Sequence, residues 1–106
     1  MILVERIKNG HGDDIGFRVS GHAGFARHGK DIVCAGVSAL VLNTINSIEE
    51  FTEDKFSCAQ EEKSGLVEFV IVSEVSKEAS LLMDSLFLGL KNIEHDYGKR
   101  FITVKA

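Results

Sequence analysis

The chain has 106 residues, of which 44% are hydrophobic, and a formal net charge of -4. This length predicts one domain over residues 1–106, and the acidic balance without a basic run argues against direct nucleic-acid binding. Two cysteines are too few for a disulfide framework, and the first ten residues lack the pattern of a signal peptide, so we expect a cytoplasmic protein.

Alternating apolar residues predict strands over about residues 2–7 and 15–21. Apolar residues at helical spacing then predict a helix over 32–50, followed by a hairpin of strands over 55–60 and 66–73. A second helix is expected over 77–97, between Ser76 as N-cap and Gly98 as stop signal, and a last strand over 101–104. Polar residues interrupt every apolar stretch before the roughly 18 residues that span a membrane, so no membrane contact is expected.

The resulting element order, ββαββαβ, indicates an α+β fold. We expect a five-stranded mixed or mostly antiparallel sheet that packs against two helices. The second helix has one apolar stripe, but Leu81, Phe87 and Leu88 lie largely outside it. These residues are either scattered surface hydrophobes or a contact in a homodimer, and we favour the dimer.

A histidine and a cysteine stand at the two ends of one glycine-rich loop. His22 follows the second predicted strand, and Cys34 lies in the first turn of the first helix. Backbone N–H groups and the helix dipole at such a position favour a thiolate, and a nearby histidine can act as its base. Cys34 and His22 are therefore the candidate catalytic pair, and the N–H groups around Cys34 are candidate donors to an oxyanion.

Other residues near this pair have two readings each. Asp31 is expected mainly to cap the helix, with orientation of His22 as the alternative. Ser38, one turn after Cys34, either lines the same groove or bonds back to a helix carbonyl.

Gly21 and Gly24 suit turn geometry and would let the loop, which has few apolar anchors, move aside for a peptide. Cys58 is expected to be an inert, core-facing thiol.

The motifs GHAG at residues 21–24 and GKDIVCAGVSAL at 29–40 resemble the signature of the Prp-type cysteine proteases. The resemblance implies a Cys34–His22 dyad, a supporting place for Asp31 and a substrate contact for Ser38. It also implies a homodimer that needs no cofactor or metal. The implied substrate is the precursor of large-subunit ribosomal protein twenty-seven, whose N-terminal extension is removed after an aromatic residue, a step required for ribosome assembly.

Two other functions remain open. A zinc-binding module could use His22, His28, Cys34 and Cys58, but structural zinc sites usually bring ligands in close pairs, and this chain has none. A non-catalytic adaptor could bind the same ribosomal protein with an incidental cysteine. Turnover, and its loss on thiol alkylation, would separate these alternatives from a protease.

Overall fold

The computed structural model describes residues 1–27 and 29–105, which form seven elements. The elements follow in this order: β1 (Ile2–Lys8), β2 (Asp14–Ser20), α1 (Ile32–Phe51), β3 (Phe56–Glu61), β4 (Leu66–Ile71), α2 (Lys77–Tyr97) and β5 (Ile102–Val104). The predicted order ββαββαβ is confirmed. Each observed boundary lies within about two residues of its prediction, as expected for ends that fray.

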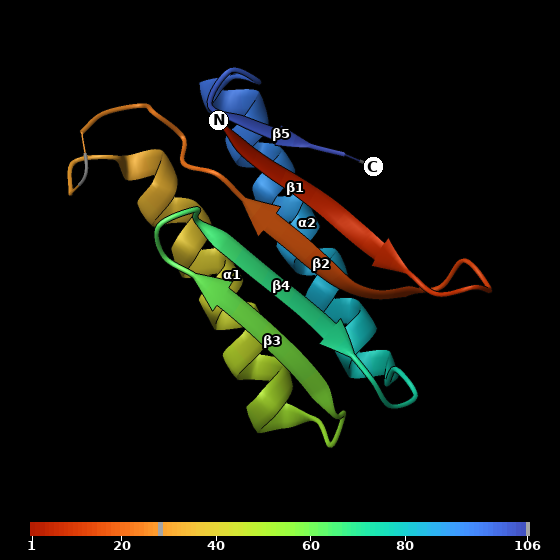
Figure 1. Ribbon diagram of the computed structural model, residues 1–106. Helices are drawn as coiled ribbons and strands as arrows, with labels where there is room; N and C mark the ends of the chain where they lie inside the picture. Colours follow the sequence, from red (N-terminus) through yellow and green to blue (C-terminus); the bar gives the residue numbers. More distant parts are fainter. Residues whose placement is uncertain (28, 106) are drawn as a thin grey trace.

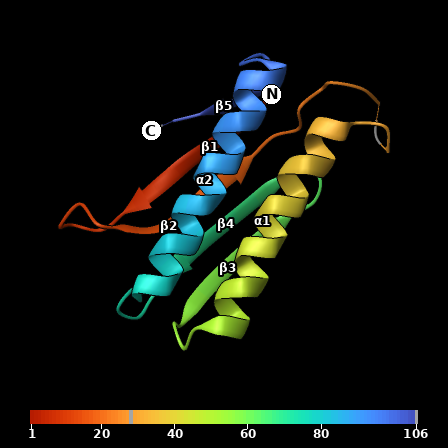
Figure 2. The same ribbon diagram turned by 180° about the vertical axis from the view of Figure 1, so that it is seen from behind.

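The five strands form one sheet in the order β3-β4-β2-β1-β5. β1 runs parallel to β5, whereas the other neighbouring pairs are antiparallel. Both helices cover the same face of this sheet (Figures 1 and 2). The predicted α+β class with a mixed sheet is therefore confirmed, and the core lies between the sheet and the helix layer.

Aromatic rings fill the centre of that core. Phe17 of β2 stacks on Phe69 of β4 with 5.1 Å between ring centroids, and Phe87 of α2 meets Phe17 edge-on at 6.5 Å. Phe87 is 1% exposed, so its predicted place outside the buried stripe is wrong: the stripe of α2 is wider than its spacing indicated. Leu81 and Leu88, by contrast, are 69% and 65% exposed.

Helix α1 buries one face against the sheet. Its buried residues are Val33, Val37, Val41, Thr44, Ile45 and Ile48. Polar residues interrupt the helix as expected, yet by length and composition it is apolar enough to cross a membrane. A core helix passes the same test, and the buried valines and isoleucines of α1 belong to the hydrophobic core.

Cys58 departs from its prediction. It pairs with Phe69 in register and so shares the side of the sheet on which Phe69 is buried. β3 is an edge strand, however, and Cys58 is exposed there as a free thiol. Alternation predicted the correct side of the strand but not whether a neighbour would cover it.

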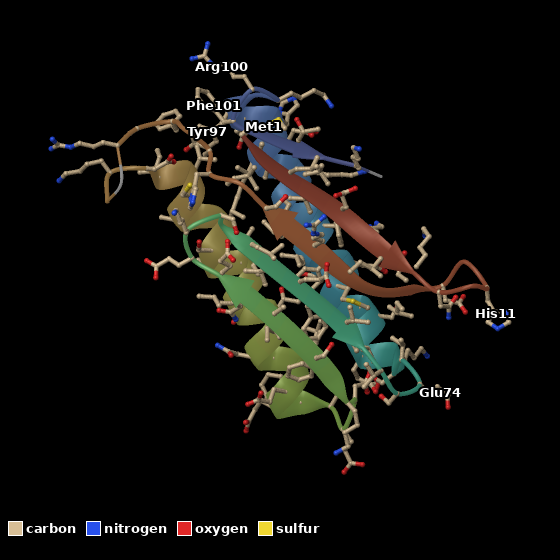
Figure 3. All side chains as sticks on the ribbon, viewed as in Figure 1. Met1, His11, Glu74, Tyr97, Arg100 and Phe101 are labelled. Carbon is tan, nitrogen blue, oxygen red and sulfur yellow. The ribbon has the colours of Figure 1, made fainter. Side chains whose placement is uncertain are left out.

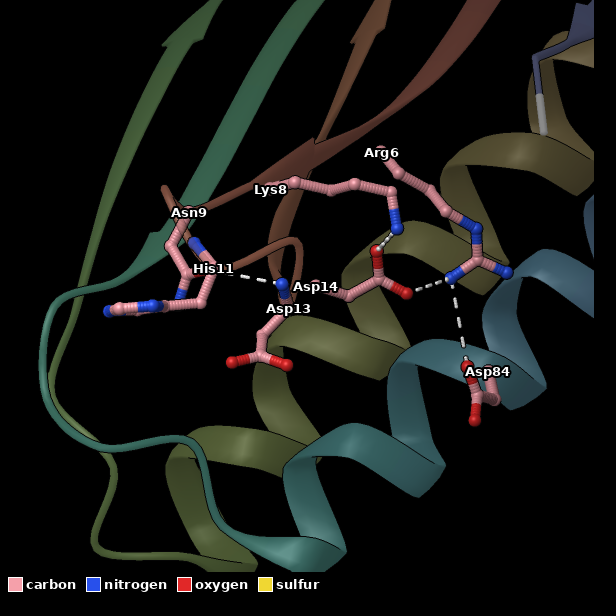
Figure 4. A network of polar contacts seen from close by, with 7 residues as sticks. All are labelled: Arg6, Lys8, Asn9, His11, Asp13, Asp14 and Asp84. Carbon is pink, nitrogen blue, oxygen red and sulfur yellow. Dashed lines mark hydrogen bonds and ion pairs between the residues drawn. The ribbon is translucent and has the colours of Figure 1, made fainter.

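A charged network closes the core at the end of β1 (Figure 4). Arg6 binds Asp14 at 2.8 Å and Asp84 at 3.6 Å, and its guanidinium lies 4.0 Å from the ring centre of Phe87. Lys8 binds the other oxygen of Asp14 at 2.7 Å. Burial raises the pKa of Asp14, but Lys8 and Arg6 outweigh it and hold that pKa below its usual value.

Candidate active site

His22 follows the end of β2, and two backbone contacts set the path of the chain there. Gly21 has a φ of 86°, and a Cβ at this position would collide with the carbonyl oxygen of Met1, so only glycine fits. The Gly21 N–H donates to the carbonyl of Ser64 at 2.9 Å. The β3–β4 turn is thereby held against the residue that precedes His22.

Cys34 is the third residue of α1, and Asp31 is the N-cap, as predicted. Asp31 accepts hydrogen bonds from the N–H of Cys34 at 3.0 Å and from the N–H of Phe25 at 3.1 Å. One carboxylate therefore caps the helix and also holds the loop. Its described hydrogen bonds do not reach His22, which supports capping as its main role.

The sulfur of Cys34 is half-buried and accepts a hydrogen bond from the N–H of Ala23 at 3.2 Å. Burial raises the pKa of the Cys34 thiol and the carboxylate of Asp31 raises it further, against the lowering effect of the Ala23 N–H. The direction of this pKa shift is opposite to the lowering that the helix start led us to expect. Because Asp31 caps that helix, it offsets the positive end of the dipole beside the sulfur.

The N–H of Cys34 was an expected oxyanion donor. In this structure it is bound to Asp31, so it does not point freely into the groove. The expectation is wrong for this one donor, and the reason is the cap itself: a carboxylate one turn away is a strong acceptor for a first-turn N–H.

The imidazole of His22 contacts the β3–β4 turn. Its Nε2 lies 3.0 Å from the carbonyl oxygen of Lys63, 41 residues further along the chain. No described hydrogen bond joins His22 to the sulfur of Cys34. The two groups line one groove without a hydrogen bond between them among the described residues.

A groove of about 680 Å³ lies between the start of α1 and the hairpin end of β3 and β4. Its lining includes every residue that the sequence nominated for the site: Gly21, His22, Gly24, Asp31, Cys34 and Ser38. Ser38 is exposed on its wall, which favours the groove-lining reading of this residue. The floor is apolar and the hairpin contributes Glu61 and Glu62, so the groove suits an apolar peptide with a basic neighbour.

The loop between His22 and Cys34 has an anchor that its sequence did not reveal. Phe25 packs edge-on against Tyr97 at 5.6 Å and Phe101 at 5.1 Å between ring centroids. Figure 3 shows Tyr97 and Phe101 together at the end of α2 and the start of β5. The expectation of few apolar anchors is therefore wrong for Phe25, whereas Gly24 and Gly29, with φ of 69° and 84°, adopt the turn geometry predicted for them.

No group of three or more histidine, cysteine or acidic side chains that could hold a metal occurs in the described part of the chain. Cys58 lies on the exposed edge strand β3 and does not line the groove that holds His22 and Cys34. His28, the fourth suggested ligand, lies outside the described residues. The described geometry thus gives the zinc alternative no support.

Sequence reasoning missed the contribution of the β3–β4 turn. Lys63 and Gly65 lie between the strands predicted over 55–60 and 66–73, in a connection to which the sequence assigned no function, yet the Lys63 carbonyl contacts Nε2 of His22. A main-chain carbonyl has no residue signature, so no motif could have identified it. The one available signal in the sequence was the glycine at position 65, because glycine permits a close approach of two backbone segments. In the structure Gly65 has a φ of 67°.

Two substitutions of Asp31 separate its effects. Asp31→Asn keeps a capping oxygen and should leave stability nearly unchanged, whereas Asp31→Ala should cost about 1 kcal/mol. Both remove a charge that raises the pKa of Cys34, so that pKa should fall and the thiolate fraction at neutral pH should increase. Thermal melts and the rate of iodoacetamide alkylation against pH measure these effects. Equal loss of turnover in both variants at unchanged stability would instead assign Asp31 to orienting His22.

Residues 1–102 match the family model described as cysteine protease Prp. A relative from Staphylococcus aureus, named ribosomal processing cysteine protease Prp, is 29% identical over 99 residues, which are 93% of each chain. The protein of the same name from Bacillus subtilis is 33% identical over 87 residues, or 78% of each chain. The family model covers the whole segment from His22 to Ser38.

Solved structures of a protease named Prp are also similar to this chain over almost its whole length. The Staphylococcus aureus ribosomal processing protease Prp with a covalently linked product peptide has a TM-score of 0.90 and 28% identity, and 99% of this chain is covered and 98% of that one. The same enzyme with a substrate peptide has a TM-score of 0.84, with equal identity and coverage. A Streptococcus mutans protein has a TM-score of 0.79 and 29% identity, with 99% and 92% covered.

Proposed function

Because the chain belongs to the cysteine protease Prp family and is a cysteine protease, we propose that Cys34 is its nucleophile and His22 its general base. The observation that carries this assignment is the groove, which both side chains line from opposite ends of one loop. A thiol and an imidazole in one groove are the two groups that covalent peptide hydrolysis requires.

In the proposed reaction, His22 takes the proton of Cys34 as the sulfur attacks the peptide carbonyl. The imidazolium then donates this proton to the leaving amine, and the acyl group remains on sulfur as a thioester. A water molecule, deprotonated by His22, hydrolyses the thioester and restores the thiol. The raised pKa of Cys34 keeps the resting sulfur protonated, so the base is needed at the moment of attack.

The proposed substrate is the precursor of large-subunit ribosomal protein twenty-seven, cut after an aromatic residue of its N-terminal extension. The apolar floor of the groove supports an apolar extension, since burial of aromatic and aliphatic side chains there is favourable. Glu61 and Glu62 at the rim and the net charge of -4 suit a basic ribosomal protein. The curated relatives named for ribosomal processing support the same class of substrate.

Incubation of the purified protein with this precursor tests the proposal. Mass spectrometry should find one truncated product, released after an aromatic residue, in molar excess over the enzyme. Prior alkylation of the enzyme with iodoacetamide should abolish the product. Stoichiometric binding without cleavage would favour the adaptor, and loss of activity with a chelator but not with the alkylator would favour the metal module.

We place this reaction in the cytoplasm, the compartment where a thiol nucleophile stays reduced without protection. Cys34 and Cys58 are both free in the structure, and Cys58 is exposed. Disulfides are rare in that compartment, so two unpaired thiols fit it.

We also propose that two copies of the chain associate through the outer face of α2. Leu81 and Leu88 lie two helical turns apart on that face and are mostly exposed. Sedimentation equilibrium should show a dimer, and a Leu81→Ser, Leu88→Ser double variant should be monomeric. Val72→Ser, which removes an equally exposed side chain elsewhere, is the control. A monomeric parent protein would contradict this assembly.

A further inference from the structure

We propose that the β3–β4 turn, residues 62–65, positions the catalytic base through the main-chain carbonyl of Lys63. The Lys63 oxygen holds His22 with its proton on Nε2, and this leaves Nδ1 as the atom that accepts the proton of Cys34. The inference rests on the proposed dyad, and it assigns a role to a segment outside the family motif at residues 21–40.

The tautomer follows from the chemistry of the contact. The carbonyl oxygen of Lys63 has lone pairs and no proton, so at 3.0 Å from Nε2 it can only accept. Nε2 of His22 must therefore carry the hydrogen. A neutral imidazole has one N–H, so its Nδ1 has the free lone pair that a general base needs.

The turn is held in place beside His22 by more than this one contact. The N–H of Gly21 donates to the carbonyl of Ser64 at 2.9 Å, and the N–H of Gly65 donates to the carbonyl of Glu62 at 3.1 Å. The pairing of Val19 with Val67 sets the register between β2 and β4 immediately below. Two successive carbonyls of the turn thus bind two successive residues of the loop that carries the base.

Gly65 permits this close approach. Its φ is 67°, and a Cβ there would collide with the carbonyl oxygen of Gly21 and lie 3.2 Å from Cε1 of His22. The imidazole therefore packs against bare backbone. Any side chain at position 65 would push the turn, and the Lys63 carbonyl with it, away from the ring.

The proton balance is complete without another group. The proton of Cys34 moves to Nδ1 as the C–S bond forms, and the same proton then passes from Nδ1 to the leaving nitrogen as the C–N bond breaks. The other proton stays bound to Nε2 throughout and is donated to the Lys63 carbonyl oxygen in a hydrogen bond. In proteases with a triad, a side-chain carboxylate takes this orienting role, whereas here Asp31 is occupied by the helix start and the loop.

Gly65→Ala and Gly12→Ala form a matched pair for the first test. Both positions have positive φ, at 67° and 82°, but a Cβ at Gly12 meets no atom within 4 Å. Both variants therefore bear the same kind of backbone strain, and only Gly65→Ala displaces the turn. We expect kcat to fall by about 10- to 100-fold in Gly65→Ala with little change in KM, and to be unchanged in Gly12→Ala. Equal kinetics in the two variants would overturn the proposal.

An ester at the Lys63 carbonyl gives a second test that keeps glycine at position 65. The α-hydroxy analogue of alanine at position 64 makes that carbonyl an ester, which is a weaker acceptor, and Ser64→Ala with a normal amide is its control. The Ser64 N–H that is lost donates no hydrogen bond among the described residues. We expect kcat to be about tenfold below that of Ser64→Ala, and equal kcat would overturn the proposal.

Nitrogen NMR of labelled histidine reads the tautomer in the resting protein, without substrate or turnover. We expect the nitrogen chemical shifts of an imidazole protonated at Nε2, and a larger share of the Nδ1-protonated tautomer in Gly65→Ala and in the ester. Protonation at Nδ1 in the parent protein would overturn the inference even if the dyad is correct. Cleavage that survives in Cys34→Ala would instead refute the dyad, so the two failures are distinguishable.

Discussion

Cys34→Ala is expected to abolish peptide cleavage, with kcat falling by about a millionfold if the acyl group is carried on this sulfur. Ser38 lines the same groove one turn from Cys34, but none of the described hydrogen bonds joins its hydroxyl to a base, so we do not expect it to replace the sulfur. The variant should remain folded, since the side chain is small and only half-buried, at a cost of about 1 kcal/mol or less. Turnover by mass spectrometry and thermal melting measure the two effects.

Cys58→Ala is the control for this variant. Cys58 is a free thiol on the edge strand β3 and does not line the groove, so its removal should leave cleavage intact. Cys34→Ala should also retain binding of the uncleaved peptide, because the apolar floor is unaltered. Cleavage by Cys34→Ala at the parental rate would show that another residue is the nucleophile.

His22→Ala is expected to lower kcat by about 100- to 10,000-fold, the usual contribution of a general base. Its remaining activity should depend steeply on pH. Burial and Asp31 raise the pKa of Cys34, so without the base the thiolate forms only as solvent pH increases. Below that pKa the rate should therefore rise about tenfold per pH unit. A pH series of initial rates on the variant and the parent protein measures this difference.

His11→Ala is the matched control, because His11 is an exposed histidine in the β1–β2 turn, far from the groove (Figure 3). Its rate and pH profile should follow those of the parent protein. A His22→Ala variant with normal turnover would remove the imidazole from the mechanism. A low rate that does not increase with pH would mean that His22 acts on a step other than ionisation of Cys34.

Strand and helix positions could be predicted because each depends on nearby residues. Alternation in β2 and helical spacing in α1 and α2 placed every element in the correct order. Burial was harder to predict at single positions. Phe87 is buried and Cys58 is exposed, since burial depends on which element covers a side chain, and that element comes from elsewhere in the chain.

Some features of the candidate site also depend on neighbouring residues, whereas others depend on residues far away in the sequence. Asp31 as N-cap and Cys34 in the first turn of α1 follow from residues only three positions apart, and the structure has both. The anchoring of Phe25 on Tyr97 and Phe101 could not be predicted, because it joins segments more than 70 residues apart in sequence. The direction of the pKa shift at Cys34 was also missed, since burial of the sulfur is its main cause.

By itself, the sequence determined the order of elements, the N-cap of α1, and the placement of a histidine and a cysteine at the two ends of one loop. These features depend on side-chain identity and local spacing, which can be read directly. Only the tertiary structure decided which atom faces His22. The Lys63 carbonyl reaches Nε2 because β2 and β4 pair in one register. Every residue carries the same carbonyl, so the position of this one depends on strand pairing and not on residue type.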